Sequence, residues 1–439
     1  MVDITIMYEH KAREMDSICL IRAEMERRGY SVAFRHASGM GEHRVVPSRV
    51  VVVPYLYRNT DLCNIRRFLQ HTQKVVNLQW EQLFTMDDEN NATRIPRNEA
   101  KNAVHVCWSE STRSRLMDGG ISSRNAVNTG PIHMDFLRPE FTGYYLSRKD
   151  IAAKYALDTG RKWCLFISSY SDRVPKSKID VYRKQGRQSA GERLVFAHES
   201  KRITLDWIEV LLRQRDSIIF IYRPHPSEHR DPRIERLERE YKNFRRIDDL
   251  SVKQWCLVCD KVLTWMSTSI VEAYFANSDC SIIRPVDIPV KLDMRIYLNA
   301  KMISSLEGFL DCIDDASGFP IAREVIEEYY GLDKDVPSYK RLCDLLDRVL
   351  HDDSACVDCN VVAETPLPGP VKDFFIHTMF HDAYVNALVL FGKTTEILKI
   401  PLVGSLRRAV NKSRVRKRDY INPKESMILV ERIKDIIGR

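Results

Sequence analysis

The residues best suited to chemistry lie in a ten-residue stretch, 217–226, which ends in Arg-Pro-His-Pro. Residues 218–222 are all apolar, β-branched or aromatic, which is typical of a strand buried on both faces of a parallel sheet. The two prolines stop this strand and stiffen the following loop, because each lacks an N–H and restricts the residue before it. Arg223, His225 and Pro226 are therefore expected at the carboxyl end of a buried strand, where open α/β sheets bind ligands. A permanent cation beside an imidazole suits a phosphate group, although a surface turn with incidental charges would have the same sequence.

A second polar motif, Ser267-Thr268-Ser269, separates a predicted strand at 261–265 from a predicted helix that reaches residue 276. The N–H groups at the start of a helix attract anions, whereas an ordinary helix cap needs only one of the three hydroxyls. The motif lies one strand–helix unit beyond Arg-Pro-His-Pro. Two adjacent strand ends would therefore present Arg, His and hydroxyl groups to the same phosphate.

Three further polar residues are candidates for the same site. Ser168 and Ser169 follow a predicted strand at 163–167, so they are expected either to line this site or to cap a loop. Glu272 lies one turn into the helix after the hydroxyl motif and is a candidate to bind sugar or ribose hydroxyls. An edge built in this way stabilises negative charge on a leaving phosphate through preorganised donors, without a metal ion.

The sequence offers little for a metal. The one Asp-x-Asp sequence, at 333–335, lies in a predicted loop between helices, away from the strand ends. Two cysteine pairs, at 256/259 and 356/359, have the internal spacing of zinc ligands. The gap between the pairs is far longer than the roughly 15–20 residues of a four-cysteine site. No metal and no other cofactor is therefore expected.

The pattern of elements predicts an α/β fold with two doubly wound parallel sheets. The chain has 439 residues and is 44% hydrophobic, enough for a large core and, by length, for two or three domains. Predicted strands and helices alternate throughout, as they do in parallel sheets. We expect an N-terminal domain at 1–140, a connector at 141–160, a C-terminal domain at 161–355 and a helical, basic tail at 356–439, with a cleft between the two domains.

At this point the sequence resembles a family. Arg223–Pro226 with Ser267-Thr268 looks like the HP and Ser-Ser/Ser-Thr motifs of bacterial GT-B glycosyltransferases of the cell surface, including sialyltransferases, polysialyltransferases and capsule Kdo transferases, which use CMP-linked sugars. The CDP-glycerol glycerophosphotransferases share this logic. Residues 77–82, Asn-Leu-Gln-Trp-Glu-Gln, also resemble proteins of surface carbohydrate biosynthesis. The resemblance covers residues 1–355 in outline. It implies the GT-B fold of two Rossmann-like domains, with His and Ser/Thr on the nucleotide phosphate and an N-domain carboxylate facing the acceptor.

The acceptor side is less well marked. Glu81 follows a predicted strand at 75–78 and is the first choice for the catalytic carboxylate, as a base or, if configuration is retained, as a nucleophile. The other acceptor-side candidates are Asp87, Asp88, His133 and Asp135. The first two resemble the acidic motif of some sialyltransferases, but Asn90 stands where a Gly is usual. A single carboxylate of this kind is more often a solvated side chain than a catalyst.

Together these features predict a glycosyltransferase that moves Kdo or another nonulosonate from a CMP-sugar to a cell-surface polysaccharide. His225 and Glu81 are its expected catalytic residues. The alternatives are a glycerophosphotransferase that uses CDP-glycerol and a non-catalytic nucleotide-binding or scaffold protein that keeps the fold. A nucleic-acid-binding role is disfavoured, because no basic face is interleaved with aromatic residues.

Charge and hydropathy indicate a cytosolic protein. The formal net charge is +8, the N-terminus lacks a basic segment followed by an apolar core, and no apolar run approaches the roughly 18 residues of a membrane span. Eleven scattered cysteines fit reduced thiols. Residues 407–418 hold seven Lys or Arg in twelve positions. This run is either a solvated helix face or a peripheral attachment to an anionic membrane surface.

Overall fold

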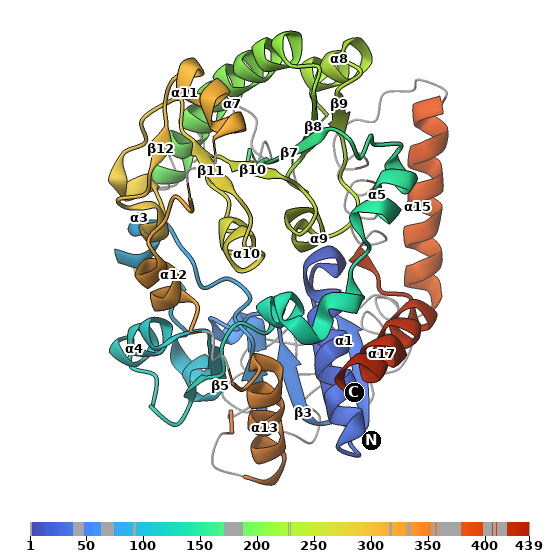
Figure 1. The fold of residues 1–439 in the computed structure, drawn as a ribbon. Helices are drawn as coiled ribbons and strands as arrows, with labels where there is room; N and C mark the ends of the chain where they lie inside the picture. Colours follow the sequence, from blue (N-terminus) through green and yellow to red (C-terminus); the bar gives the residue numbers. More distant parts are fainter. Residues whose placement is uncertain are drawn as a thin grey trace. The chain divides into compact units, whose positions relative to one another are not determined.

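The computed structural model describes residues 2–37, 48–62, 74–90, 94–170, 188–226, 228, 230–315, 318–331, 335–352, 356–357, 379–397, 406, 410 and 419–438. The chain forms two compact units (Figure 1). The first unit comprises Met1–Gln82, Arg94–Phe136 and Tyr330–Arg439, and the second comprises Leu83–Thr93 and Leu137–Tyr329. Each contains one six-stranded parallel sheet.

The sheet of the first unit has the strand order β2-β1-β3-β4-β5-β6. Its strands are β1 (Val2–Tyr8), β2 (Val32–His36), β3 (Ser48–Val53), β4 (Val75–Asn77), β5 (Val104–Cys107) and β6 (Ala126–Asn128). Its helices are α1 (Lys11–Arg27), α4 (Glu110–Asp118), α13 (Ser338–His351), α15 (Met379–Ile397) and α17 (Pro423–Ile437). The four valines at 50–53 are fully buried between β1 and β4, as a continuous apolar run requires.

The sheet of the second unit has the order β12-β11-β10-β7-β8-β9. Its strands are β7 (Lys162–Ile167), β8 (Ile218–Arg223), β9 (Phe244–Arg246), β10 (Lys261–Thr264), β11 (Cys280–Ile283) and β12 (Met302–Ile303). Its helices are α3 (Met86–Asn90), α5 (Arg148–Tyr155), α7 (Gln188–Gln214), α8 (Pro232–Glu240), α9 (Val252–Cys256), α10 (Ile270–Phe275), α11 (Leu306–Asp314) and α12 (Arg323–Tyr329).

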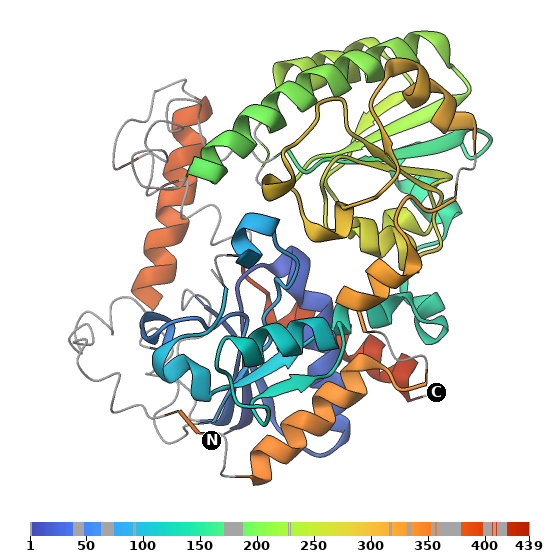
Figure 2. The same ribbon diagram turned by 90° about the vertical axis from the view of Figure 1, so that its left-hand side faces the viewer.

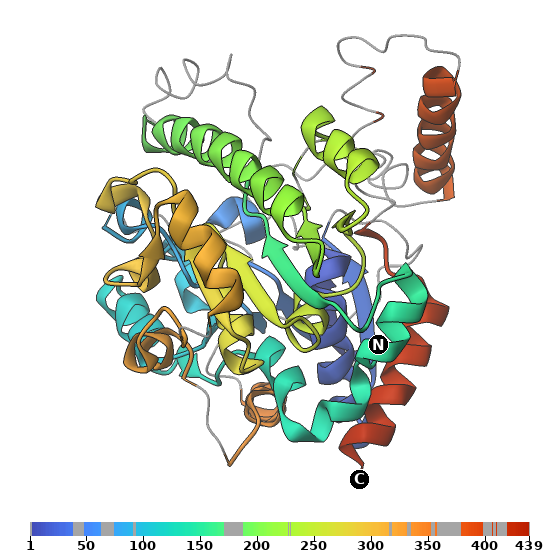
Figure 3. The same cartoon turned by 45° about the horizontal axis from the view of Figure 1, so that its top comes forward.

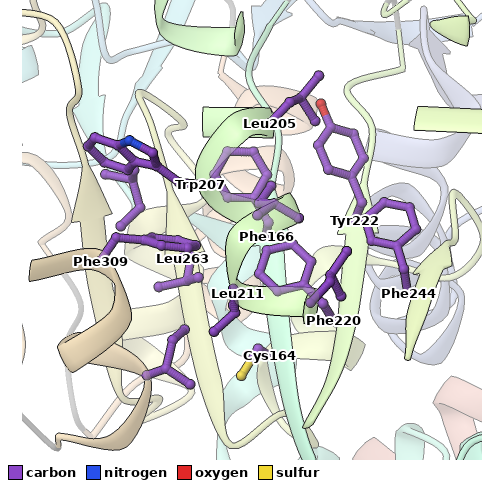
Figure 4. Close-up of a cluster of buried hydrophobic side chains, with 14 of the residues drawn as sticks. Cys164, Phe166, Leu205, Trp207, Leu211, Phe220, Tyr222, Phe244, Leu263 and Phe309 are labelled. Carbon is purple, nitrogen blue, oxygen red and sulfur yellow. The ribbon is translucent and has the colours of Figure 1, made fainter. Parts of the chain in front are cut away.

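The long helix α7 covers one face of the second sheet (Figure 3). Its apolar side chains meet those of β7, β8 and α11 in one buried cluster, which Figure 4 shows in close-up. Phe166 and Tyr222 stack there with ring centroids 5.5 Å apart, and both side chains are fully buried. Because Tyr222 lies near the carboxyl end of β8, this core holds that strand end in place.

The two parallel sheets confirm the predicted fold class of two Rossmann-like units, the GT-B architecture. Each strand named from the sequence above is present, with ends that shift by a residue or two. The cleft between the units stays a prediction. The basic run at 407–418 lies almost entirely outside the described residues, so membrane attachment also stays a prediction. Across the part of the chain that the structure describes, no helix combines the length and the apolar character that a bilayer span requires.

The structure draws the unit boundaries differently from the sequence. Helix α13, which the sequence assigns to the C-terminal domain, packs in the first unit against α1 and β3 (Figure 2). Its apolar stripe is buried there, and Asp344 forms an ion pair of 2.7 Å with Arg28. Helix α17, from the predicted tail, also packs against α1, where Lys434 lies 2.8 Å from Glu26. Residues 83–93, by contrast, belong to the second unit.

Candidate functional site

Three neighbouring strands of the second sheet end level with one another. Thr264 of β10, Ile167 of β7 and Arg223 of β8 are paired in register in a single row. The prediction that the strands before the two motifs are adjacent is wrong, because β7 lies between β8 and β10 in the sheet and β9 lies between them in the chain. Strands β8 and β9 follow β7 toward one edge of the sheet, and β10, β11 and β12 continue from β7 toward the other edge. The topological switch point therefore lies between β7 and β10. Open α/β sheets bind ligands outside the carboxyl ends of the strands at such a point. The loops that follow these three strands are therefore the candidate site.

Hydrogen bonds across the switch point join the ends of β7 and β10. The hydroxyl of Ser169 accepts a hydrogen bond of 3.1 Å from the backbone N–H of Met266. Two residues earlier in each segment, the hydroxyl of Thr264 donates to the carbonyl of Ile167 at 3.3 Å. The structure thus brings Ser169 next to the segment that enters the Ser267-Thr268-Ser269 motif.

On the other side of β7, the loop after β8 is organised by Glu228, a residue outside the motifs singled out in the sequence. Its side chain is only 1% exposed. It accepts hydrogen bonds from the hydroxyls of Ser168 (2.6 Å) and Tyr222 (2.7 Å) and from the backbone N–H of His225 (3.1 Å). The ammonium of Lys201, on α7, lies 3.0 Å from it. Burial first, and the Glu228 charge next, raise the pKa of the Tyr222 phenol well above its ordinary value, so this hydroxyl stays protonated and donates.

The loop that carries His225 is held by its backbone. The N–H of His225 donates to the Glu228 carboxylate, and its carbonyl accepts from the Glu228 N–H at 2.8 Å. The side chains of His225 and Pro226 are exposed at this edge of the sheet. The imidazole is therefore presented on a fixed loop, as expected from the two prolines.

Arg223 differs from the expectation. Its guanidinium donates to the backbone carbonyls of Asp249 (2.7 Å) and Leu250 (2.5 Å), in the turn before α9. Leu250 has a φ of 62°, a strained conformation for a residue with a side chain. Burial lowers the pKa of Arg223, and the nearby Glu272 charge opposes this shift. Two of the donors on Arg223 thus stabilise a turn of the protein itself, and its contact with a phosphate stays a prediction.

The hydroxyl motif forms the turn before α10, whose N-cap residue Ser269 makes no capping hydrogen bond with its side chain. The Ser267 hydroxyl accepts from the N–H of Ser269 at 3.2 Å, and the Ser267 carbonyl accepts from the hydroxyl of Tyr297 at 2.7 Å. Thr268 is the most exposed of the three. Glu272, a predicted sugar ligand, is instead in an ion pair of 3.1 Å with Lys253 and is mostly buried. Thr268 and His225 are therefore the side chains of this edge best placed to meet a ligand.

Glu81, the candidate acceptor carboxylate, lies in the first unit. Its side chain is 46% exposed and forms ion pairs with Arg13 (3.1 Å) and Arg94 (3.0 Å), neither of which the sequence singled out. The segment is fixed by Gln82, whose amide donates to the carbonyl of Val106 and accepts from the N–H of Trp108, both at 2.9 Å. Glu81 thus lies where β4 ends, as predicted, on a stretch that is hydrogen-bonded to the end of β5.

The two other candidates of the first unit differ in surroundings. His133 lies among aromatic rings, with centroid distances of 4.8 Å to Trp108 and 6.2 Å to Tyr330. Asp135 is fully buried and accepts the N–H groups of Ser338 (3.1 Å) and Tyr339 (2.6 Å) at the start of α13. The structure therefore assigns Asp135 a role as a helix cap, and its burial leaves no surface for an acceptor.

Asp87 and Asp88 are carried by the second unit, not by the N-terminal domain of the prediction. They lie on the short helix α3, where Asp88 accepts from the hydroxyl of Thr85 at 2.9 Å. The backbone N–H of Met86 donates to the carbonyl of Asp293, also in the second unit. The local sequence does not indicate that residues 83–93 pack in the second unit, while the residues before and after them in the chain belong to the first unit.

Among the described residues, no group of three or more His, Cys, Asp or Glu side chains is arranged to hold a metal ion. Burial raises the pKa values of Cys256 and Cys259 well above the ordinary value, which keeps both as thiols. Asp333 and Cys359 lie outside the described residues. The expectation of no metal stays a prediction.

Comparison with known proteins gives similarity at the level of solved structures. No family model and no curated protein matches the sequence. A co-structure of MnaA and UDP from S. aureus is 12% identical, covers 80% of this chain and 97% of its own, and has a TM-score of 0.49. The UDP-GlcNAc 2-epimerase of Methanocaldococcus jannaschii is 12% identical, the match covers 79% of this chain and 99% of the epimerase chain, and the TM-score is 0.49. The wall teichoic acid polymerase TagF is 11% identical, the match covers 80% of this chain and 89% of the polymerase chain, and the TM-score is 0.48. Similarity this distant leaves the activity of this chain to be inferred from its own residues.

Proposed function

We propose that this chain is a glycosyltransferase of GT-B architecture that transfers Kdo or another nonulosonate from a CMP-sugar to a cell-surface glycan. The observation that supports the proposal most is the carboxyl edge of the second sheet. Three strands end there in one row, their loops are joined by hydrogen bonds through Ser169 and Glu228, and His225 and Thr268 are exposed on them. The motifs of His-Pro and Ser-Thr that resemble CMP-sugar transferases lie on this edge.

In the proposed reaction, the bond between the anomeric carbon and the phosphate oxygen of the donor breaks. The leaving phosphate gains negative charge, which an imidazole N–H of His225 and the hydroxyl of Thr268 stabilise. The oxygen of an acceptor hydroxyl forms the new bond to the anomeric carbon, and its proton passes to the carboxylate of Glu81. Arg13 and Arg94 fix the position of that carboxylate. If configuration is retained, Glu81 acts instead as the nucleophile.

The nucleotide preference tests this proposal directly. CMP should raise the melting temperature more than CDP, UDP or GDP, because the base and phosphate are recognised before transfer. A ligand at about 100 times its Kd adds about 2.7 kcal/mol to the free energy of unfolding. A thermal-shift series with the four nucleotides measures this. Preference for CDP would favour the transfer of glycerol phosphate, preference for UDP would exclude a CMP-sugar donor, and binding with no transfer to any acceptor would favour a scaffold.

Turnover is expected to be independent of divalent metal, because protein donors alone meet the leaving phosphate in this proposal. Activity measured in excess EDTA should equal activity in buffer with magnesium. A loss in EDTA that magnesium or manganese reverses would contradict the proposed mechanism and would place metal ligands in the site.

Attachment to an anionic membrane surface is a further part of the proposal. It rests on the sequence of the basic run at 407–418, seven of whose twelve residues are Lys or Arg. Each basic residue near such a surface contributes about 1 kcal/mol. The acceptor would then be a growing glycan held at the cytoplasmic face of the membrane.

A further inference from the structure

Glu228 lies at the centre of a buried network that connects three segments of the second unit: the end of β7, helix α7 and the chain from the end of β8 to Glu228 itself. Its two carboxylate oxygens each have two partners. Lys201 and Tyr222 meet Oε1, at 3.0 Å and 2.7 Å. Ser168 and the backbone N–H of His225 meet Oε2, at 2.6 Å and 3.1 Å. The network therefore reaches from the core helix α7 to the loop that presents the candidate phosphate ligand.

The four partners differ in what they can do. The hydroxyls of Ser168 and Tyr222 can rotate, and a hydroxyl can either donate or accept. The ammonium of Lys201 and the backbone N–H of His225 can only donate. These two obligatory donors face different oxygens of Glu228. Only a group with an acceptor at both positions satisfies them together, and among side chains of this length that group is a carboxylate.

We propose that Glu228 is the positioning residue of the candidate nucleotide site, which it serves by fixing the backbone of His225 so that the imidazole meets the donor phosphate. The inference rests on the proposed function. Glu228 is 1% exposed and touches no ligand itself; it acts through His225 and Ser168. Lys201 supplies the opposite charge that a buried carboxylate needs, and it also lies 2.8 Å from Asp231, at the start of α8.

The variant Glu228→Gln tests this role, because it replaces one of the two carboxylate oxygens with an NH₂ group that cannot accept a hydrogen bond. In either orientation of the amide, its NH₂ group faces an obligatory donor, so one of the two hydrogen bonds is lost and a buried donor is left unsatisfied. The favoured orientation keeps the amide oxygen on the Lys201 charge and turns the NH₂ group toward His225. The Kd of the nucleotide that the wild-type protein binds best should then rise about tenfold.

Adding Lys201→Met to Glu228→Gln should restore the nucleotide affinity that Glu228→Gln alone lowers. In the double variant Lys201→Met, Glu228→Gln, no obligatory donor remains at Oε1, and the amide can turn its oxygen to the N–H of His225. The Kd should return to within about threefold of the wild-type value, a coupling that partners in one network show. A residue that merely stabilised the fold would not give this rescue, because the second substitution removes another buried charge.

The matched control is Asp279→Asn. Lys261 is fully buried and lies 2.8 Å from Asp279, in the same unit but at the amino-terminal edge of the sheet. This variant should lower the melting temperature and leave the Kd unchanged. If Asp279→Asn and Glu228→Gln raise the Kd alike, Glu228 is only structural.

Hydrogen exchange of the His225 amide gives a readout that needs no nucleotide. Protection of this amide should fall in Glu228→Gln, return in the double variant and be unchanged in Asp279→Asn. Unchanged protection in Glu228→Gln would overturn the positioning role whatever the protein binds. Suppose that protection falls in Glu228→Gln and returns in the double variant, but the wild-type protein binds none of the four nucleotides. The hydrogen-bond network would then be supported, whereas its role in nucleotide binding and the proposed function would both be refuted. Wild-type binding that Glu228→Gln leaves intact would overturn the inference alone.

Discussion

His225→Ala is expected to lower kcat about 10²–10³-fold, which corresponds to roughly 2.7–4 kcal/mol of transition-state stabilisation. The loss should fall on kcat and not only on KM, because the hydrogen bond from the imidazole strengthens as charge grows on the leaving phosphate. The fold should survive, since the side chain is exposed and its backbone bonds to Glu228 remain in alanine. Steady-state kinetics and the melting temperature of the same preparation measure both effects.

Two variants control for this result. His225→Asn should recover only part of kcat, because an amide donates a hydrogen bond but carries no charge. His351→Ala removes another exposed imidazole, on α13 in the first unit, and should leave kcat unchanged. A stable and fully active His225→Ala protein would remove the main support for the donor site, and a lower melting temperature with normal turnover would assign His225 a structural role.

Glu81→Gln is expected to abolish most transfer while donor binding stays intact. A positioned general base contributes about 10²–10⁴-fold, so kcat should fall by that factor. Stability should change little, because exposed ion pairs such as those of Glu81 with Arg13 and Arg94 contribute about 0–1 kcal/mol. The assay compares transfer to acceptor with the Kd of the nucleotide in the same variant.

Glu110→Gln is the matched control for that change. Glu110 is exposed, lies on α4 of the same unit and pairs with Arg113 at 2.9 Å. Loss of this ion pair should alter neither transfer nor binding. If Glu81→Gln behaves like Glu110→Gln, the acceptor base is another residue and Glu81 is an ordinary surface carboxylate.

The strands were predictable because their signal is local. The valines of β3 and the apolar residues of β8 are continuous runs that only a buried parallel strand accommodates. Strands β9 and β12 escaped prediction. The first reads Phe-Arg-Arg, the second is two residues long, and both lie at sheet edges, where pairing rather than hydrophobicity defines the strand.

The packing partners of helices were not predictable from periodicity. The apolar stripe of α13 shows that one face is buried, but not that the face meets α1 and β3, more than 280 residues earlier in the chain. For the same reason, no local pattern indicates that Asp135 caps this helix. A side chain that satisfies backbone groups of a distant segment looks in the sequence like any other carboxylate.

The positions of the candidate site residues in the fold were predictable from the sequence, but their hydrogen-bond partners were not. The pattern of strand ends followed by polar loops indicated that the candidate residues lie at the carboxyl edge of the second sheet, as they do, and their contact with a ligand stays a prediction. Whether a polar side chain there faces a ligand or the protein depends on residues far away in sequence: Ser168 is bonded to Glu228, 60 residues later. Glu228 itself stands three positions after His225, and this closeness to the Arg-Pro-His-Pro motif was a local signal that could have identified it.

The route of the chain through its two units has a consequence for how such a protein can be recombined. The backbone passes from one unit to the other after residues 82, 93, 136 and 329. No single junction in a gene therefore separates them: a fragment that stops at residue 136 loses α13 and α17, and one that starts at 137 loses α3. Chimeras that join the front half of one such protein to the back half of another would mix pieces of both units. Exchanging one unit alone therefore requires an insertion with matched ends.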